Sequence, residues 1–323
     1  MDRIESLSVL VPVYNSERTI GRLVDVVVAT VGPEFSRLQV VLVNDGSRDG
    51  SHELCLGIYA KYPDMVRYVK LAKNFGEHNA VMCGLRHVDC DCVAIIDDDF
   101  QNPPEEILKL VAELRKGYDV VYSYYVKKQH PWLRNLGSRF NDRLATLLLK
   151  KPRGLYLSSF KVVNRFLVRA VTVYEGPYPY LDALIFQCTG SIGTCLCEHR
   201  IREEGRSNYN LRRLVRLWLN MFTGASVMPL RLGAMLGFVM ASVGLLLAVV
   251  FAISWCIEGQ LLYESIPKGW ASIIVSVTLF AGIQLCVLGM IGEYLGRLFL
   301  THNRCPQYVV REVHGPGQDE APD

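Results

Sequence analysis

The run Asp97-Asp98-Asp99, followed by Gln101, contains the residues best suited to binding a metal ion. In an extended segment Asp97, Asp99 and Gln101 project to one side and Asp98 to the other. Two carboxylates and an amide oxygen are ligands that Mg²⁺ or Mn²⁺ prefers, and a bound diphosphate would complete the coordination. An isolated Asp run more often caps the following helix. The apolar run before Asp97 places these groups at the end of a strand, which favours the metal site.

Two further polar turns follow apolar runs, Pro12 to Glu17 and Asn44 to Ser47. Polar groups at the carboxyl ends of adjacent parallel strands converge on one ligand, and an acidic residue there can accept hydrogen bonds from a base or a ribose. Neither turn contains G-x-G-x-x-G or G-K-[ST]. Their absence argues against a dinucleotide dehydrogenase and against a P-loop phosphotransferase.

The elements that must position these turns are short, Val-rich runs typical of strands buried on both faces of a parallel sheet. The predicted strands are Leu7 to Tyr14, Gln39 to Asn44, Val66 to Leu71, Cys92 to Ile96 and Asp119 to Tyr124, with further strands at Gly154 to Phe160 and Gly193 to Ile201. Helical patterns lie between them, near Asn79 to His87 and Pro104 to Arg115. This alternation predicts a doubly wound α/β domain over residues 1–209.

The last third of the chain has the composition of a membrane segment. Residues 232–257 and 270–291 contain no charge, and each is long enough for a transmembrane helix, so we expect a two-helix hairpin within 230–299. An amphipathic helix, Leu211 to Phe222, is expected at the interface within 210–229. Residues 300–323 are expected to form a tail that is disordered from Gly315 onwards.

Basic residues near the spans indicate the orientation. Arg212, Arg213, Arg216 and Arg231 precede the first span, Arg297, Arg304 and Arg311 follow the second, and the loop from Glu258 to Gly269 has Lys268 as its single basic residue. The catalytic domain and both termini are therefore expected on the cytoplasmic side. The polar start from Met1 to Ser8 gives no sign of a signal peptide.

Composition limits the other possibilities. The 323 residues have a net charge of +3, which is too small to suggest a nucleic-acid partner. The ten cysteines are expected to be reduced thiols. Pairs such as Cys90 with Cys92 and Cys195 with Cys197 lack the spacing of common zinc sites, so we interpret them as small core residues.

The combination of VPVYN, NDGS, NFGEHNAVMCGL and DDDFQNPPEE resembles the family-2 glycosyltransferases of the GT-A fold. The paired spans and the segment Gly292 to Arg297 (GEYLGR) resemble one subgroup, the transferases that place a sugar on dolichyl or undecaprenyl phosphate. This resemblance covers nearly the whole chain. It implies inverting, metal-dependent transfer from a nucleotide-sugar, with UDP as the expected nucleotide and Mg²⁺ or Mn²⁺ as cofactor.

The resemblance also implies roles for individual residues. Nucleotide-sugar binding falls to Pro12, Tyr14, Asn15, Glu17, Asp45, Asp97 and Ser207, metal binding to Asp99 and Gln101, and catalysis to Asp97, Asp99 and Arg202. Arg202 and Ser207 belong to a segment similar to the family pattern R-x-x-G-x-S-K-Y. Asn208 replaces the Lys of that pattern, so one cation is missing from the expected diphosphate site.

For the acceptor phosphate, Arg134 and Ser138 match the subgroup pattern W-x-[RK]-x-x-x-S. A further Arg of the subgroup corresponds to Tyr125 here. Its missing charge could come from Lys127 and Lys128, although solvated loop lysines are at least as good an interpretation.

Three more residues lie near the expected sugar pocket, and two of them stay open to two interpretations. Many relatives have an Asp where this chain has Ser159. Asp182 could lie near the sugar or could cap a helix. His78 could reach the donor, but a role in packing at a helix start is favoured.

The expected protein is thus a multi-pass enzyme of the inner membrane that binds a nucleotide-sugar, a polyprenyl phosphate and the membrane. The resemblance also implies a homo-oligomer, with a tetramer as one expected form. A processive polysaccharide synthase would need more spans and a Q-x-x-R-W element, neither of which is present. A partner that has lost activity is the other alternative, given Tyr125, Ser159 and Asn208, but Asp97, Asp99 and Gln101 are intact.

Overall fold

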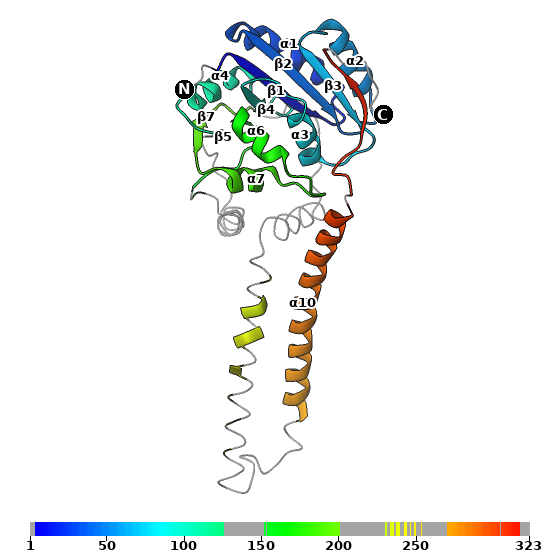
Figure 1. The fold of residues 1–323 in the computed structure, drawn as a ribbon, viewed down its shortest axis with the longest axis vertical. Helices are drawn as coiled ribbons and strands as arrows, with labels where there is room; N and C mark the ends of the chain where they lie inside the picture. The colour runs from blue at the N-terminus through cyan, green and yellow to red at the C-terminus, as the bar shows by residue number, and fades with distance from the viewer. Residues whose placement is uncertain are drawn as a thin grey trace. The chain divides into compact units, whose positions relative to one another are not determined.

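The computed structural model describes residues 4–125, 152, 154–200, 270–303 and 305–316, together with scattered positions between 230 and 253 (Figure 1). It divides into two compact units. One comprises Met1–Trp218 and Arg304–Asp323, and the other comprises Leu219–Asn303. The first unit contains the sheet and the second contains the long helix α10.

An eight-stranded mixed sheet forms the centre of the first unit, in the order β7-β5-β6-β4-β1-β2-β3-β8. Its strands are β1 Ser6–Val13, β2 Arg37–Asn44, β3 Val66–Leu71, β4 Cys92–Ile95, β5 Val120–Tyr124, β6 Lys161–Asn164, β7 Ile192–Leu196 and β8 Val310–His314. The neighbours β4, β1, β2 and β3 are parallel. Strands β6 and β8 run antiparallel to β4 and β3, respectively.

Helices cover both faces of this sheet. On one face lie α1 Ile20–Thr30, α2 Ser51–Lys61 and α4 Ile107–Leu114, the last preceded by the 3₁₀ turn η2 Pro104–Glu106, while η1 Gly32–Glu34 follows α1. On the other face lie α3 Glu77–Leu85, α6 Arg165–Thr172 and α7 Leu181–Cys188. The predicted doubly wound α/β architecture is therefore confirmed for this unit.

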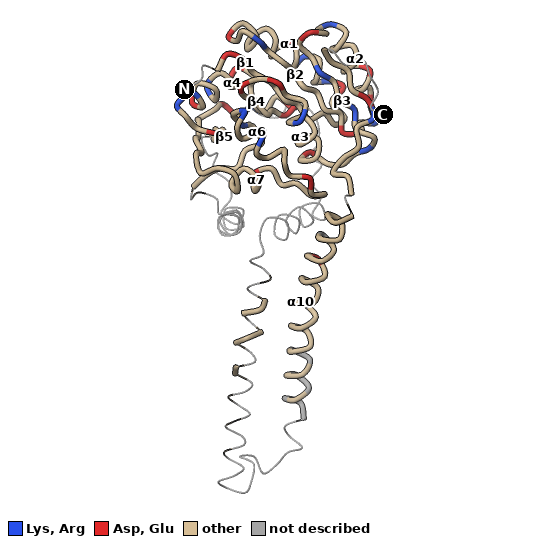
Figure 2. The backbone as a smooth tube through the Cα atoms, viewed as in Figure 1, with Lys and Arg blue, Asp and Glu red and all other residues tan. Residues whose placement is uncertain are grey.

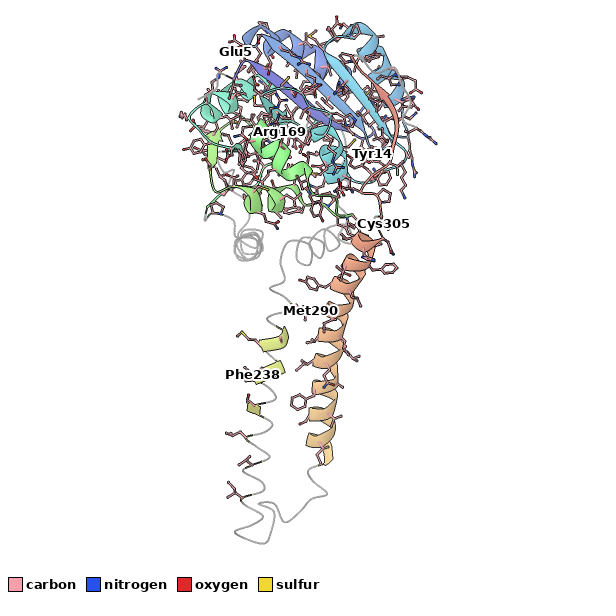
Figure 3. All side chains as sticks on the ribbon, in the orientation of Figure 1. Glu5, Tyr14, Arg169, Phe238, Met290 and Cys305 are labelled. Carbon is pink, nitrogen blue, oxygen red and sulfur yellow. The ribbon has the colours of Figure 1, made fainter. Side chains whose placement is uncertain are left out.

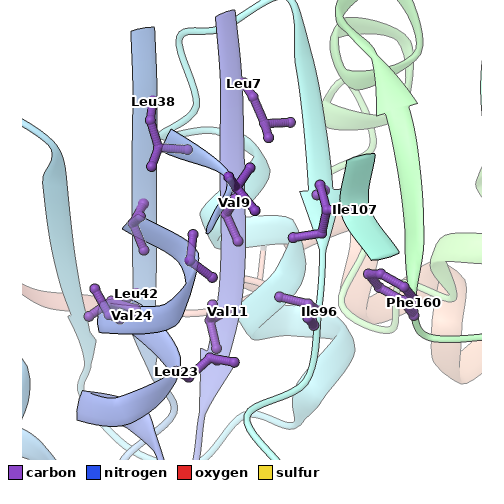
Figure 4. Packing of buried hydrophobic residues seen from close by; sticks show 14 of the residues in the cluster. Leu7, Val9, Val11, Leu23, Val24, Leu38, Leu42, Ile96, Ile107 and Phe160 are labelled. Atoms are coloured by element: carbon purple, nitrogen blue, oxygen red, sulfur yellow. The ribbon is translucent and has the colours of Figure 1, made fainter. Parts of the chain in front are cut away.

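Each central strand is buried on both faces because it alternates apolar side chains between the two layers. Leu7, Val9 and Val11 pack with Leu23 and Val24 of α1 in the first layer (Figure 4). Leu10, between them, belongs to the second layer. Because β4, β1 and β2 run parallel, they end at the same edge of the sheet, where their polar turns follow.

The five predicted strands from Leu7 to Tyr124 and the two predicted helical segments are confirmed, with differences of one or two residues at most ends. The predicted strand from Gly154 to Phe160 is wrong, because the strand begins at Lys161. The Ser158 hydroxyl accepts a hydrogen bond from the Phe160 amide at 3.2 Å and lies 2.8 Å from the Ser123 hydroxyl. These side-chain bonds favour a turn over a continued ladder. Strand β7 also ends at Leu196, earlier than predicted.

The residues after 305 join the sheet, which the sequence did not suggest. Strand β8 pairs with β3, and Lys70 of β3 forms an ion pair with Glu312 at 3.2 Å. Arg86 donates to the Tyr308 hydroxyl at 2.8 Å. Gly315 still forms a bridge, whereas the rest of the predicted disordered end, 317–323, lies outside the described residues. The segment protects the β3 edge from unwanted pairing.

Helix α10, Trp270–His302, contains Phe280–His302, the one helix among the described residues that is long and apolar enough to cross a membrane. Figure 2 shows it free of Lys, Arg, Asp and Glu over most of its length, and Figure 3 shows its side chains projecting outward. The predicted second span, 270–291, lies within it. The described positions between 230 and 253 are helical. Most of the first span and all of residues 210–229 lie outside the described residues, so the hairpin remains a prediction.

Candidate functional site

The acidic turn follows β4 directly, at the carboxyl edge of the sheet. The Asp99 carboxylate accepts a hydrogen bond from the Gln101 amide at 3.1 Å, which closes a tight turn. Phe100 has a φ of 55°, and the Arg22 guanidinium lies 4.0 Å from the centre of its ring. A left-handed backbone is costly for a bulky residue and is concentrated at functional sites. The turn is therefore held in a conformation that local preferences alone would not select.

Asp97 faces the strand β6 side of the turn. Ile95 pairs with Lys161 in the antiparallel ladder, so Asp97 lies opposite Ser159 when this register is extended. The Ser159 hydroxyl donates to the Asp97 carboxylate at 2.6 Å. Burial and the nearby charge of Glu77 raise the pKa of Asp97 to about 7, although the Ser159 hydrogen bond opposes the shift. Ser159 thus stands directly against the acidic turn.

Asp98 faces the other way, towards the β1 turn. Burial raises the pKa of Asp98 to about 6, while a hydrogen bond from Ser16 works against the increase. Its second carboxylate oxygen is buried, with no hydrogen-bond partner in the described part of the chain. The alternation expected of Asp97 and Asp98 is therefore present in the structure.

Asp98→Asn should stabilise the protein at pH 8, by about 1 to 3 kcal/mol, since it removes a buried charge and keeps an oxygen for Ser16. The native pKa lies above its unfolded value, so the carboxyl favours folding at low pH and loses that contribution as pH rises from about 4 to about 6. The advantage of the Asp98→Asn variant should grow across this window. Thermal unfolding of both proteins between pH 4 and pH 8 measures it.

Asp91→Asn is the matched control, for which we expect the opposite change in stability. Burial alone would raise the pKa of Asp91, but hydrogen bonds from Ser6 and from the Glu5 amide outweigh it and lower the pKa. Its contribution to stability is present at neutral pH and is lost as pH falls through the native pKa. Asp91→Asn should therefore destabilise the protein at pH 8. A destabilised Asp98→Asn at pH 8 would contradict the prediction for that residue.

The turns after β1 and β2 are joined to each other by hydrogen bonds. Asn15, with a φ of 56°, accepts from the Arg48 amide at 2.9 Å and donates its own amide to Ser47 at 3.0 Å. Glu17 accepts from the Gly50 amide at 2.9 Å. Tyr14 is exposed beside them (Figure 3). Pro12 lies in β1, opposite Val43. The structure thus brings these predicted nucleotide-binding residues together, and Asn15 and Glu17 also fix the loop.

Asp45 is buried at the end of β2 and connects to a third loop. Its carboxylate oxygens accept the amides of Phe75 at 2.7 Å and Gly76 at 2.9 Å. The adjacent Gly46 has a φ of 66°, and a Cβ there would lie 2.6 Å from the Asn74 nitrogen. Only glycine fits this approach. Asp45 and Gly46 therefore hold the segment between β3 and α3 against the β2 turn.

Tyr125, which stands at the position of an Arg in the subgroup, connects two loops through its hydroxyl. Its hydroxyl donates to the Asn102 side chain at 2.5 Å and lies 3.0 Å from the Ser158 hydroxyl. The ring packs 4.3 Å from that of His199. Tyr125 therefore ties the acidic turn to the segment before β6, and its hydroxyl is occupied by protein groups.

Several predicted site residues fall in parts of the chain without a described structure. Lys127, Lys128, Arg134, Ser138, Arg202, Ser207 and Asn208 all lie outside the described residues. Their assigned roles in acceptor and diphosphate binding remain predictions.

The structure adds residues that the sequence analysis did not select, above all Lys161 at the start of β6. Lys161 is buried and forms an ion pair with Asp182 of α7. Asp182 does not cap this helix, since Tyr180 is the N-cap residue and no side chain bonds there. His78 packs edge-on against Tyr180 at 5.1 Å, in line with the packing role favoured for it. A lysine inside the run Phe160-Lys-Val-Val was the available signal for Lys161.

The donor set at the acidic turn fits a hard divalent ion in part. Asp99 and Gln101 lie in the same turn, and the side chain of each has an oxygen that can bind a metal ion. Within the described ranges there is no group of three His, Cys, Asp or Glu residues arranged to hold an ion. Asp99 and Gln101 would offer an ion only part of a coordination shell, and a diphosphate would have to supply further ligands.

Residues 8–172 match the family described as Glycosyl transferase family 2. The chain is 30% identical over 315 residues to an undecaprenyl-phosphate 4-deoxy-4-formamido-L-arabinose transferase of Serratia proteamaculans, covering 98% of this chain and 96% of the relative. The enzyme of the same description from Proteus mirabilis is 29% identical over 314 residues, covering 97% and 95% of the two chains.

Among solved structures, glucosyl-3-phosphoglycerate synthase of Mycobacterium tuberculosis, in complex with Mn²⁺ and UDP-glucose, has a similar fold. The TM-score is 0.52 at 19% sequence identity, and the match covers 68% of this chain and 77% of the synthase. The likeness confirms a GT-A-like fold. The family match and the named transferases identify the chain as a glycosyltransferase that belongs to glycosyl transferase family 2.

Proposed function

We propose that the chain transfers a sugar from a nucleotide-sugar, with UDP as the expected nucleotide, to undecaprenyl phosphate or a related polyprenyl phosphate. The observation that carries the proposal is the fraction of this chain that each kind of similar protein matches. The soluble-acceptor synthase matches 68% of the chain, whereas transferases named for undecaprenyl phosphate match 98%. The chain also contains the candidate span within α10. A lipid acceptor explains why such a helix accompanies the catalytic unit.

The donor would lie across the carboxyl ends of β1, β2 and β4. The β1 and β2 turns with Asp45 would receive the nucleotide, and Asp97 would face the sugar. Asp99 and Gln101 are oxygen donors that would hold Mg²⁺ or Mn²⁺, which supplies positive charge to the departing diphosphate. The synthase of similar fold was solved with Mn²⁺ and UDP-glucose, which supports this assignment.

The acceptor's nucleophile would be a phosphate oxygen that is already anionic near neutral pH, so removal of a proton by a protein base would contribute little. Ser159 at the position of the family's acid is compatible with this chemistry. The protein's task is to place that oxygen in line behind the anomeric carbon and to stabilise the leaving group. Inversion by a single displacement is the expected stereochemical course.

We also propose a two-helix hairpin with the catalytic unit and both termini on the cytoplasmic side. The exposed apolar side chains of α10, such as Leu285, Leu288 and Leu298, would then contact lipid. The polyprenyl chain of the acceptor would lie in the same bilayer, with its phosphate at the membrane surface. We also propose that the protein forms a homo-oligomer, as expected from the resemblance to the family.

A screen of nucleotide-sugars tests the proposed reaction. The full-length protein in detergent is incubated with undecaprenyl phosphate, Mn²⁺ or Mg²⁺ and each donor, and lipid-linked product is identified by mass spectrometry. We expect a product that depends on both metal and lipid phosphate. Transfer to a soluble acceptor such as 3-phosphoglycerate without transfer to the lipid would overturn the proposal. A growing polymer would favour the processive synthase.

Arg134→Ala should raise the acceptor concentration needed for half-maximal transfer by roughly 10- to 100-fold and leave UDP binding nearly unchanged. A guanidinium can hold two phosphate oxygens at once, which the truncated side chain cannot do. Acceptor titrations give the first quantity and calorimetry with UDP and Mn²⁺ gives the second. Lys127→Ala is the parallel variant. If Arg134→Ala weakened UDP binding instead, Lys127 or Lys128 would become the acceptor cation.

A further inference from the structure

Behind the acidic turn lies a buried ion pair that the proposed reaction does not use. Lys161 and Asp182 have side chains that are 4% and 9% exposed. The Tyr122 hydroxyl donates to the same Asp182 carboxylate at 2.9 Å, and the Lys161 ammonium lies 4.8 Å from the centre of the Tyr122 ring. Such a pair is costly to desolvate, and apolar residues of similar volume often serve stability equally well. Its presence beside the site therefore calls for a role other than stability.

The sheet topology places Lys161 at a junction of three elements. In the ladder Lys161 is opposite Ile95 of β4 on one side and opposite Tyr122 of β5 on the other. Asp182 reaches it from the first turn of α7. The ion pair thus fixes the start of β6 to both neighbouring strands and to the helix that covers them.

Ser159 is two residues before Lys161, so its position depends on where β6 begins. Its hydroxyl donates to Asp97 at 2.6 Å. The intervening Phe160 is fully buried, and its carbonyl accepts from the Ser123 hydroxyl at 2.9 Å. A shift of Lys161 along the ladder would therefore carry Ser159 away from Asp97.

We propose that Lys161 and Asp182 are positioning residues, which hold the Ser159 hydroxyl on Asp97 and thereby fix the orientation of the Asp97 carboxylate towards the donor sugar. The inference rests on the proposed function, because it takes Asp97 as a donor-facing group. Ser159 occupies the position of an acid in many relatives. Here a hydroxyl donor at that position restrains the neighbouring acid, and the ion pair restrains the hydroxyl.

The first test is a set of variants assayed as the full-length protein with undecaprenyl phosphate and the donor that the wild type uses. Lys161→Met should lower kcat by about 10-fold, the loss expected when the Ser159 contact to Asp97 is removed, with the donor KM changed by less than about threefold. Ser159→Ala should lower kcat by about 10-fold or more. The double variant Ser159→Ala/Lys161→Met should be no worse than Lys161→Met alone, because both changes act through one contact.

A second pair of variants separates positioning from folding. Lys161→Met leaves Asp182 buried without its partner and should lower Tm, whereas Lys161→Met/Asp182→Leu should recover Tm without recovering kcat. Recovery of both Tm and kcat would overturn the inference, as would losses in the Ser159/Lys161 double variant that multiply. Lys61→Met is the control. Lys61 pairs with Asp25 on the exposed surface of α1 and α2, and its loss should change neither quantity appreciably.

The contact between Ser159 and Asp97 can also be tested without any transfer assay. In a high-resolution structure of Lys161→Met with UDP and Mn²⁺, the Ser159 hydroxyl should no longer lie within hydrogen-bond distance of Asp97. A retained Ser159 contact would overturn the inference whichever substrate the enzyme uses. Absence of transfer by the wild type, in contrast, would count against the proposed function alone, because this structural readout does not depend on it.

Discussion

Asp99→Ala is expected to abolish sugar transfer, with a loss of about a thousandfold or more, while the protein stays folded. Asp99 is the carboxylate proposed to hold the metal ion that stabilises the departing diphosphate, and removing such a charge acts directly on the transition state. The hydrogen bond that it accepts from the Gln101 backbone amide is local to the turn, so the variant should remain folded. Nucleotide release in the presence of donor, lipid phosphate and Mn²⁺ measures the loss.

Asp98→Asn is the matched comparison, because its side chain lies in the same turn but faces Ser16. It should keep most of the activity, and Tm should confirm that both variants are folded. Substantial transfer by Asp99→Ala with an intact requirement for Mn²⁺ would exclude Asp99 as the metal ligand. A greater loss in Asp98→Asn than in Asp99→Ala would show that the roles within the turn are assigned in the wrong order.

Much of the fold could be predicted because the central strands carry a strong local signal. Strands such as β2 are apolar on both faces, and that pattern is visible in the sequence itself. Strand β8 has no such signal. Two of the five residues in its sequence VREVH are charged, and it forms a strand by pairing with β3, where Lys70 also bonds to Glu312 across 242 residues of chain. A contact of that separation leaves no trace in a local pattern.

The candidate site likewise has some contacts that could be predicted from the sequence and others that could not. Groups that follow parallel strands, such as Asp45 and Asp97, could be predicted to lie together, since parallel strands end at one edge. The Ser159 contact to Asp97 could not, because it depends on the register of the antiparallel strand β6, and the predicted strand there was displaced by several residues. The environment of Tyr125 was equally hidden, since its partners Asn102 and Ser158 come from two other loops.

Asp45→Ala is expected to destabilise the protein by about 2 to 4 kcal/mol and to weaken UDP binding by about 100-fold or more. The structural reason is that one buried carboxylate accepts two backbone amides, from Phe75 and Gly76, and so holds the loop before α3. The functional reason is that the same group is proposed to bind the nucleotide. Asp45→Asn should be intermediate in stability, because the amide keeps one acceptor oxygen but turns its own N–H groups towards a donor.

Asp91→Ala distinguishes the two reasons. Asp91 also accepts two backbone amides, those of Glu5 and Ser6, but at the opposite end of the strands, where β1 begins. Both variants should lower Tm, whereas calorimetry with UDP and Mn²⁺ well below either Tm should find weakened binding in Asp45→Ala alone. Equal loss of UDP affinity in the two variants would mean that the effect follows from stability. Unchanged UDP affinity in Asp45→Ala would remove Asp45 from the nucleotide site and leave it the role of fixing the loop between β3 and α3.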